Sequence, residues 1–343
     1  MIKVLIVDDS AVVRDLLSRA LAQDDRFKVV ATAIDPFSAR QKLAQHEVDV
    51  ITLDIEMPRM DGLTFLKHLM KYHPIPVIVV SSLTDGSNSA SMEALSLGAL
   101  EIVPKPGGAY TISEIIETLK EKIVAAASAD FGKVRSQVEK NRERMPAPGA
   151  KNLSHIKTTN KLIAVGASTG GTIALETLFL GFTPQFPSAV CVIHMPEKFT
   201  TTFADRLNRL CQVNVHEAVD GELIQPATIY LAPGNKHMAV RARGKDFQIR
   251  LMDGPKIHHQ RPAVDILFDS VADQVGRNAI GILLTGMGRD GAAGLLKIKE
   301  AGGHTIAQDE ASCIVFGMPK EAIDLGAADE VLALDSIAPS LRW

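Results

Sequence analysis

Short apolar runs alternate with helical patterns from Lys3 to Ala127, and this alternation is the feature that most constrains the fold. Five strand–helix alternations predict a parallel sheet with helices on both faces. In such a sheet, ligands bind outside the carboxyl ends of the strands, where the strand order reverses. The expected strands are Lys3–Val7, Val29–Ala33, Val48–Leu53, Pro76–Val80 and Glu101–Val103.

Polar residues stand at or just past the carboxyl ends of four of these strands: Asp8, Asp9, Asp54, Ser81 and Lys105. Three carboxylates brought together repel, and their pKa values rise unless a cation intervenes. Oxygen ligands in that number suit Mg²⁺, which leaves positions open for phosphate oxygens. A single aspartate after a strand is more often a turn residue. Five matched positions instead predict a phosphoryl-accepting site with Asp54 as the nucleophile.

Three segments resemble the motifs of response-regulator receiver domains: Val7–Ser10, Leu53–Gly62 and Pro104–Pro106. The resemblance covers residues 1–125 and implies a flavodoxin-like (βα)5 fold. It also implies that a partner histidine kinase phosphorylates Asp54 and that Ser81 is the switch hydroxyl, with Lys105 nearby. The implied Mg²⁺ ligands are Asp8, Asp9, Asp54 and the backbone carbonyl of Glu56. Many receivers have an aromatic residue where this chain has Ile102, so the residue gives no support to switching by an aromatic flip.

Residues 126–159 are predicted to form an interdomain linker. The segment Phe131–Arg144 alternates in charge and fits a solvated helix. The prolines and glycine of Met145–Gly149 are typical of a domain boundary. A chain of 343 residues is comfortable for two domains, each with its own core.

A second candidate site begins at Lys161–Gly171, where an apolar run breaks into a glycine-framed turn before a helical pattern. Gly166–Gly170 fits the G-x-S-x-G nucleophile elbow, with Ser168 as the exposed hydroxyl. The same turn suits anion binding at a helix N-terminus. A plain helix cap by Ser168 is the third interpretation. The stretch alone leaves all three open.

The remaining residues 160–343 alternate strands and helices, which predicts a doubly wound parallel α/β domain. A two-stranded antiparallel hairpin is expected at Met238–Arg243 and Phe247–Met252.

Ser168, His194 and Asp290 each follow an apolar strand, so an open parallel sheet can bring them to one crevice. A histidine can take the proton of a weakly acidic serine hydroxyl, and a carboxylate can orient that histidine. The glycines beside Met287 allow a backbone N–H to face a developing oxyanion.

Taken singly, His194 fits a turn residue and Asp290 fits a helix N-cap. Asp309 competes with Asp290 for the orienting role. His258, His259 and Arg261 are candidates to line the cleft.

With the receiver motifs ahead of it, the second half resembles the catalytic domain of the chemotaxis protein-glutamate methylesterases. The segments that carry this resemblance are Gly166–Gly171, His194–Pro196, Arg261–Asp265 and Thr285–Gly291. It implies nucleophile Ser168, base His194, orienting Asp290 and the Met287 N–H in an oxyanion hole. The implied substrates are glutamate methyl esters on chemoreceptors, and also certain receptor glutamines, with no cofactor for the hydrolysis. The receiver is implied to inhibit the esterase until Asp54 is phosphorylated.

Charge and composition weigh against other function classes. A net charge of −3 gives no overall attraction to nucleic acid or to anionic membranes. A response regulator with a DNA-binding output would need a helix-turn-helix and a basic patch, which are not evident. A serine hydrolase of small esters is the other alternative.

No apolar run approaches the ~20 residues of a membrane span. The isolated Cys191, Cys211 and Cys313 are expected to be reduced, as in a cytoplasmic protein.

Overall fold

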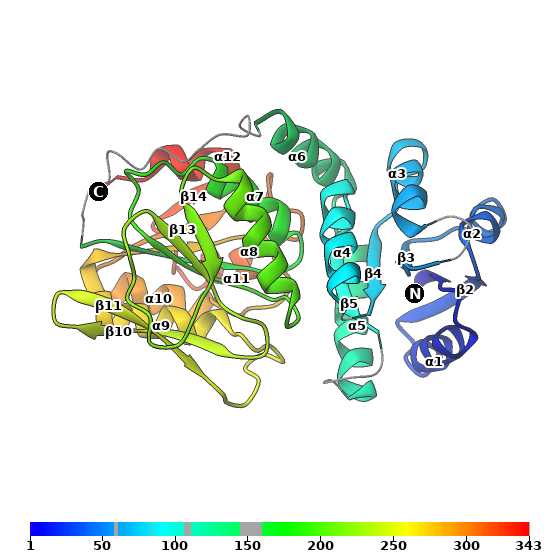
Figure 1. The fold of residues 1–343 in the computed structure, drawn as a ribbon, viewed down its shortest axis with the longest axis horizontal. Coiled ribbons are helices and arrows are strands. Elements are labelled where there is room, and N and C mark those ends of the chain that lie inside the picture. Colours follow the sequence, from blue (N-terminus) through cyan, green and yellow to red (C-terminus); the bar gives the residue numbers. More distant parts are fainter. Residues whose placement is uncertain (58–60, 83, 106–110, 145–159, 343) are drawn as a thin grey trace. The chain divides into compact units, whose positions relative to one another are not determined.

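The chain folds into two compact units, residues 1–138 and residues 139–343. A computed structural model of the protein describes residues 1–57, 61–82, 84–105, 111–144 and 160–342 (Figure 1). The motif residues Pro58–Met60 and Pro106, and the predicted boundary residues Met145–Gly149, lie outside these ranges.

The first unit contains the predicted five strand–helix alternations. Its elements are β1 (Ile2–Val7), α1 (Ala11–Ala22), β2 (Phe27–Ala33), α2 (Pro36–Leu43), β3 (Val50–Leu53), α3 (Gly62–Tyr72), β4 (Val77–Ser81), α4 (Asp85–Leu97), β5 (Glu101–Pro104) and α5 (Ile112–Ala127).

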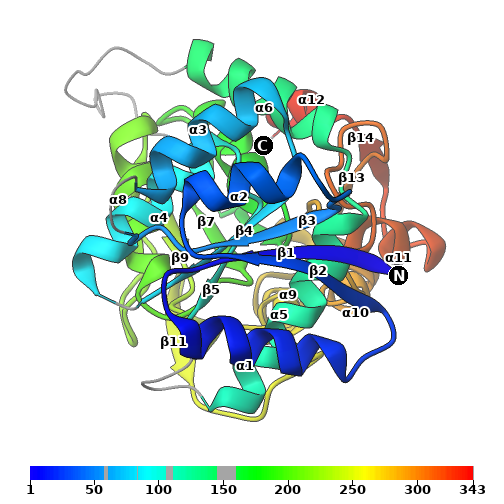
Figure 2. The ribbon, with the colours of Figure 1, turned by 90° about the vertical axis from the view of Figure 1, so that its right-hand side faces the viewer.

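All five strands are parallel, in the order β2-β1-β3-β4-β5. Helices α1 and α5 cover one face of the sheet, and α2, α3 and α4 cover the other (Figure 2). The buried residues of β1, β3 and β4 form the core between these layers. Strand β2 lies on one side of β1, and the chain then returns to place β3 on the other side. The strand order therefore reverses between β1 and β3. The carboxyl ends of these two strands therefore border the crevice of this sheet.

Helix α6 (Phe131–Arg144) occupies the start of the predicted linker. It is not wholly solvated, because Asn141 is buried within the second unit. The Asn141 amide donates to the Ile173 carbonyl at 3.1 Å and accepts from the Thr177 hydroxyl at 2.8 Å. Arg144 also pairs with Asp335 at 2.7 Å. The end of α6 is therefore fastened to the second unit.

The second unit is also an α/β sandwich, with the predicted antiparallel appendage. Its elements are β6 (Leu162–Ala167), α7 (Gly171–Leu180), β7 (Ala189–Ile193), α8 (Phe199–Leu210), β8 (Asn214–Glu217), β9 (Thr228–Leu231), β10 (His237–Arg243), β11 (Asp246–Met252), α9 (Val264–Val275), a 3₁₀ turn (Gly276–Asn278), β12 (Ala279–Leu283), α10 (Ala292–Glu300), β13 (His304–Gln308), α11 (Met318–Asp324), β14 (Glu330–Leu332) and α12 (Leu334–Ser340).

Seven parallel strands form its sheet in the order β14-β13-β12-β6-β7-β9-β8. Helices α7, α8 and α12 cover one face, and α9 and α10 cover the other (Figure 1). The hairpin β10–β11 lies against α9, where the Ser270 hydroxyl accepts the Val240 N–H at 2.9 Å. The strand order reverses at β6, which has β7 on one side and β12 on the other.

Two elements of the second unit were not predicted. The short edge strand β14 and the helix α12, which contains Pro339, carry weak local patterns. Helix α9 begins at Val264, because the preceding residue Ala263 has an extended backbone. The three cysteines are buried, and no disulfide joins any two of them. Every helix in the described ranges is too short or too polar to cross a bilayer.

Candidate functional site

The first unit gathers the predicted acidic residues at the switch point of its sheet. Asp8 and Asp9 follow β1, Asp54 follows β3, and carboxylate oxygens of all three lie within 4.8 Å of one another. Lys105, which follows β5, places its Nζ 2.7 Å from Asp54 Oδ2 and 3.2 Å from Asp8 Oδ2. Asp8 and Asp54 are almost completely buried. One ammonium group therefore faces several crowded carboxylates.

The charge balance of this cluster disfavours ionised carboxylates. Burial raises the pKa of Asp54 from 3.8 to about 6, against the opposing hydrogen bond and charge of Lys105. Burial likewise raises the pKa of Asp8. For Lys105, burial opposes the charged form, but the hydrogen bond and charge of Asp54 outweigh it and the pKa is raised. The single ammonium group of Lys105 is therefore too little positive charge to neutralise the carboxylates of this cluster.

The donor set fits a divalent cation that prefers oxygen. Asp8 Oδ2 is buried and accepts no well-directed hydrogen bond from the described residues, although it lies close to Lys105. A buried carboxylate oxygen without a hydrogen bond is costly unless a cation takes its lone pair. The residues present therefore suit Mg²⁺.

The other predicted receiver residues also lie at this edge or beside it. Ser81, at the end of β4, is buried, and its hydroxyl donates to the Ser82 carbonyl at 3.4 Å. The Glu56 N–H donates to Asp54 Oδ1 at 3.1 Å, and the Glu56 carboxylate accepts from Ser82. Ile102 is buried in β5 beside Val79.

The second candidate site lies at the switch point of the seven-stranded sheet. Ser168 follows β6, His194 follows β7, and Met287 and Asp290 lie in the segment after β12. Ala167 pairs with Ile193 in register, so Ser168 and His194 are the next residues on neighbouring strands. Neighbouring strands lie about 4.8 Å apart. The main chain thus brings the hydroxyl and the imidazole to adjacent positions.

The turn after β6 is held tightly in place. The Ser168 N–H donates to the Thr285 carbonyl at 3.0 Å. Gly170 has φ +76°, a left-handed conformation that favours glycine. Gly286 lies so close that a Cβ there would be 2.7 Å from the Ser168 Cβ. These contacts determine where the hydroxyl lies.

Ser168 does not cap helix α7. The N-cap is Gly170, and no side chain supplies the capping hydrogen bond. The capping interpretation of this turn is therefore wrong, and the nucleophile and anion-binding interpretations remain.

Asp290 holds the imidazole of His194 from the far side. Asp290 Oδ2 lies 2.8 Å from His194 Nε2, and both side chains are 2% exposed. With Asp290 ionised, Nε2 carries the proton and Nδ1 is the basic nitrogen. No hydrogen bond joins Ser168 to His194 within the described residues. Such bonds are often long or misaligned before substrate binds.

The carboxylate of Asp290 also caps a helix from another part of the chain. Its Oδ2 accepts the Val264 N–H at 2.7 Å, and its Oδ1 accepts the Asp265 N–H at 2.9 Å. These are the first two residues of α9, whose own N-cap Ala263 has no capping side chain. A helix N-terminus stabilises a carboxylate. Burial by itself would raise the pKa of Asp290, but the contact with His194 and these two N–H groups lower it.

A second carboxylate, that of Asp265, also binds one histidine and the start of one helix. Asp265 Oδ1 accepts the Gly294 N–H of α10 at 2.8 Å, and Asp265 Oδ2 contacts His258 Nε2 at 3.1 Å. Burial raises the pKa of Asp265, and the charge of Asp290 adds to the rise. The interpretation of Asp290 as the N-cap of its own helix was therefore wrong, because α10 begins at Ala292 with Gly291 as its N-cap, and Asp265 accepts from the first turn.

Met287 provides the N–H that was predicted to stabilise an oxyanion. The preceding residue is fixed, since the Gly286 N–H donates to the Val315 carbonyl and the Gly286 carbonyl accepts from Met318. The Met287 N–H has no acceptor among the described residues, and its side chain is 41% exposed. An amide group with no internal acceptor is available to a ligand.

The competing candidates have other contacts. Asp309 accepts from the N–H and hydroxyl of Ser312 at 2.9 and 2.6 Å, in the turn after β13. Arg261 binds the Asn235 side chain at 2.6 Å. His258 supports Asp265, as described above. His259 is in a left-handed turn with φ 62°.

Two residues that support the site had not been singled out. Thr285, fully buried two residues after β12, donates its hydroxyl to the Thr169 carbonyl at 3.0 Å. The buried Gln308 accepts the Thr285 N–H at 2.8 Å. Both are polar residues at the ends of apolar strands, which is the signal that could have found them.

Known protein families match both halves of the chain. The family model described as CheB methylesterase matches residues 163–341, and the response regulator receiver domain matches residues 4–117. The protein-glutamate methylesterase/protein-glutamine glutaminase 2 of Syntrophus aciditrophicus is 50% identical over 342 residues, which cover 99% of this chain and 98% of the relative. The corresponding enzyme of Salmonella typhi is 45% identical over 345 residues, covering 99% and 96%.

A solved structure supports the fold of the second half. The CheB methylesterase catalytic domain of Thermotoga maritima is 39% identical, with a TM-score of 0.52. It matches 53% of this chain and 97% of that domain. These matches do not support a DNA-binding output or a hydrolase of free small esters.

Proposed function

The chain belongs to the protein-glutamate methylesterase/protein-glutamine glutaminase family, with a regulatory receiver domain ahead of a CheB methylesterase domain, and we propose that Ser168, His194 and Asp290 perform its hydrolysis. One observation carries this assignment above all. His194, in register beside Ser168, contacts the buried carboxylate of Asp290 at 2.8 Å.

In the first half of the reaction, Ser168 Oγ attacks the carbonyl carbon of a glutamate methyl ester. Its proton passes to His194 Nδ1, because Nε2 is already engaged by Asp290. The negative charge that develops on the carbonyl oxygen faces the Met287 N–H. Loss of one such donor in a hydrolase costs about 10²–10³ in rate.

Collapse of this intermediate breaks the bond between the carbonyl carbon and the methoxy oxygen. His194 donates its proton to that oxygen, so methanol leaves and an acyl-serine remains. A water molecule then gives a proton to His194 and adds to the acyl carbon. His194 returns its proton to Oγ as the carbon–Oγ bond breaks, which restores the Ser168 hydroxyl. The new glutamate carboxyl group loses its remaining proton to solvent and is released as the carboxylate. With glutamine as substrate, the same steps release ammonia.

Asp290 stabilises the imidazolium formed at each proton transfer. The N–H groups of Val264 and Asp265 keep this carboxylate ionised, since they donate to it from the start of α9. The helix therefore contributes to catalysis through Asp290, without touching the substrate.

In the receiver domain, Asp54 is the proposed phosphorylation site, with a sensor histidine kinase as donor. The proposed ligands of Mg²⁺ are Asp8, Asp9, Asp54 and the backbone carbonyl of Glu56. Bound Mg²⁺ would neutralise the crowded carboxylates and the incoming phosphoryl oxygens. Lys105 Nζ, already 2.7 Å from Asp54, pairs with a phosphoryl oxygen, and the Ser81 hydroxyl donates to another. These contacts would favour the active state of the receiver.

Phosphorylation of Asp54 is proposed to release the esterase from inhibition by the receiver. A shift from about 1:99 to 99:1 between the inhibited and released states requires ~5.5 kcal/mol of differential stabilisation. The proposed substrates are methylated chemoreceptors.

Methanol release from methylated receptor membranes tests these assignments. Ser168→Ala should reduce kcat by at least about 10³-fold. Ser336→Ala is the matched control, because it also removes a serine hydroxyl, and Ser336 is exposed on α12. Full activity in Ser168→Ala would exclude it as the nucleophile. If a small phosphodonor modifies Asp54 and leaves the rate unchanged, the regulatory proposal fails.

A further inference from the structure

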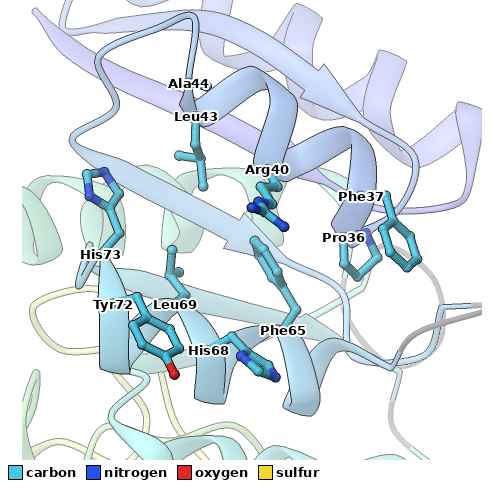
Figure 3. A pocket seen from close by; sticks show the side chains of 10 residues that line it. All are labelled: Pro36, Phe37, Arg40, Leu43, Ala44, Phe65, His68, Leu69, Tyr72 and His73. Carbon is cyan, nitrogen blue, oxygen red and sulfur yellow. The ribbon is translucent and has the colours of Figure 1, made fainter.

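A hollow lies between α2 and α3 in the receiver domain. Its volume is about 670 Å³, and Figure 3 shows side chains of both helices around it. Phe65 and Leu69 of α3 are largely buried, and Leu43 of α2 is half-buried. We call this feature the α2–α3 groove. None of the proposed phosphorylation residues lines it.

Exposed aromatic side chains stand along the rim of the α2–α3 groove. Phe37 is 55% exposed and Tyr72 is 69% exposed. Exposed aromatic groups beside an apolar hollow are typical of protein-binding surfaces, where aromatic and arginine side chains are enriched.

The two helices that form the α2–α3 groove are basic and contain no aspartate or glutamate. Their cations are Arg40 and Lys42 on α2, and Lys67 and Lys71 on α3. This is unusual in a chain with more acidic than basic residues. Within the described ranges, none of these four side chains forms an ion pair or a hydrogen bond. Lys71 lies over the Tyr72 ring at 4.9 Å. Of these four residues, only Arg40 lines the groove, and Lys71 adjoins it through the rim residue Tyr72. The rim therefore carries the positive charge of Arg40 and Lys71, which the described chain does not neutralise.

We propose that the α2–α3 groove docks an acidic, amphipathic helix of the receptor substrate. Two neighbouring helices offer a groove that the apolar ridge of a third helix fills. Helix α2 is about 12 Å long and α3 about 16 Å, which matches two to three turns of a partner helix. Carboxylates flanking that ridge would pair with Arg40 and Lys71.

The chemistry of the reaction supports an acidic partner. This proposal rests on the receptor substrate proposed above. Each ester that the enzyme hydrolyses leaves a glutamate carboxylate, so the surface around a remaining ester becomes more acidic as the reaction proceeds. A basic groove separate from the catalytic serine would hold such a surface near the enzyme.

Charge reversal in the α2–α3 groove tests the proposal. The variant is Arg40→Glu/Lys71→Glu, and the control is Lys28→Glu/Lys245→Glu, which places the same charge change on exposed lysines elsewhere. Methanol release is measured over a range of receptor-membrane concentrations, with Asp54 fully phosphorylated from a small phosphodonor. Hydrolysis of N-acetylglutamate γ-methyl ester is measured in parallel.

The groove variant should raise KM for receptor membranes about tenfold at low salt, with kcat and small-ester hydrolysis unchanged. The difference should shrink in ~0.5 M salt. Phe37→Ala, which alters no charge, should also raise KM. Equal KM values for the groove and control variants would overturn the proposal, as would an equal loss on the small ester. Failure of the proposed function is distinguishable, because it would appear as full activity in Ser168→Ala.

Discussion

Asp290 acts both as a hydrogen-bond acceptor and as a negative charge. Replacing it by asparagine separates these two roles, because asparagine retains the shape and loses the charge. The carboxylate accepts from His194 Nε2 and the Val264 N–H through Oδ2, and from the Asp265 N–H through Oδ1. An amide has only one oxygen. If that oxygen takes the Oδ2 position, the amide NH₂ faces the Asp265 N–H. If the amide is flipped, NH₂ faces both other donors.

The first orientation leaves one N–H donor without an acceptor and the flipped one leaves two, so the first is preferred. A buried N–H left without an acceptor costs about 1–3 kcal/mol. We therefore expect Asp290→Asn to reduce the free energy of unfolding by that amount. The pKa of Asp290 lies below its ordinary value of 3.8, despite burial, because of His194 and the two N–H groups. Its stabilising contribution is therefore present above pH 3.8 and is lost as the pH falls through the lower folded-state value.

The catalytic cost follows from the missing charge. A carboxylate within hydrogen-bond distance stabilises a neighbouring positive charge by about 1.4–4 kcal/mol. In the preferred orientation, Nδ1 of His194 remains the base, so kcat should fall about 10- to 10³-fold. In the flipped orientation His194 would have the wrong tautomer, and the loss would approach ~10⁴-fold.

The assay is methanol release from receptor membranes, together with urea unfolding of the same samples. Asp309→Asn is the matched control, since it makes the same change at the carboxylate that competes in the sequence. It should leave kcat unchanged. The reasoning is refuted if Asp290→Asn stays within about threefold of wild type, or if Asp309→Asn lowers kcat equally.

Three further substitutions test other parts of the structure. Burial raises the pKa of Asp54 from 3.8 to about 6, so the folded state binds this proton more tightly than the unfolded state. Its stabilisation is complete below pH 3.8 and is lost as the pH rises through about 6. Without Mg²⁺, Asp54→Asn should therefore become more stable than wild type above that pH, by up to about 3 kcal/mol in urea unfolding. Gly286→Ala would place a Cβ 2.7 Å from that of Ser168, so we expect lower kcat and a loss of about 1–3 kcal/mol, measured by methanol release and thermal unfolding. Asn141→Ala removes the two buried hydrogen bonds of the Asn141 amide, to the Ile173 carbonyl and the Thr177 hydroxyl, and should cost about 1–3 kcal/mol in urea unfolding, whereas unchanged stability would mean that α6 is not fastened there.

The sequence was sufficient for fold class, because helical and strand periods are local properties. The alternation of these periods predicted both parallel sheets. The polar residues after apolar runs predicted that Asp54, Ser168 and His194 lie at the carboxyl edges of the two sheets, which is where they are found. Parallel strands end at one edge, so a residue that follows a strand lies at that edge in any strand order. Short elements with a weak hydrophobic pattern were not predicted, such as the three-residue strand β14.

Strand order and helix packing were decided only by the tertiary structure. Asp290 and Asp309 both follow apolar strands, and their local patterns are equivalent. The sheet places β12 directly beside β6 and β13 one strand further away, so Asp290 contacts His194 and Asp309 does not. The start of α9 then meets Asp290 through residues far away in the chain. Such neighbours depend on how whole elements pack, and no local pattern of residues records that.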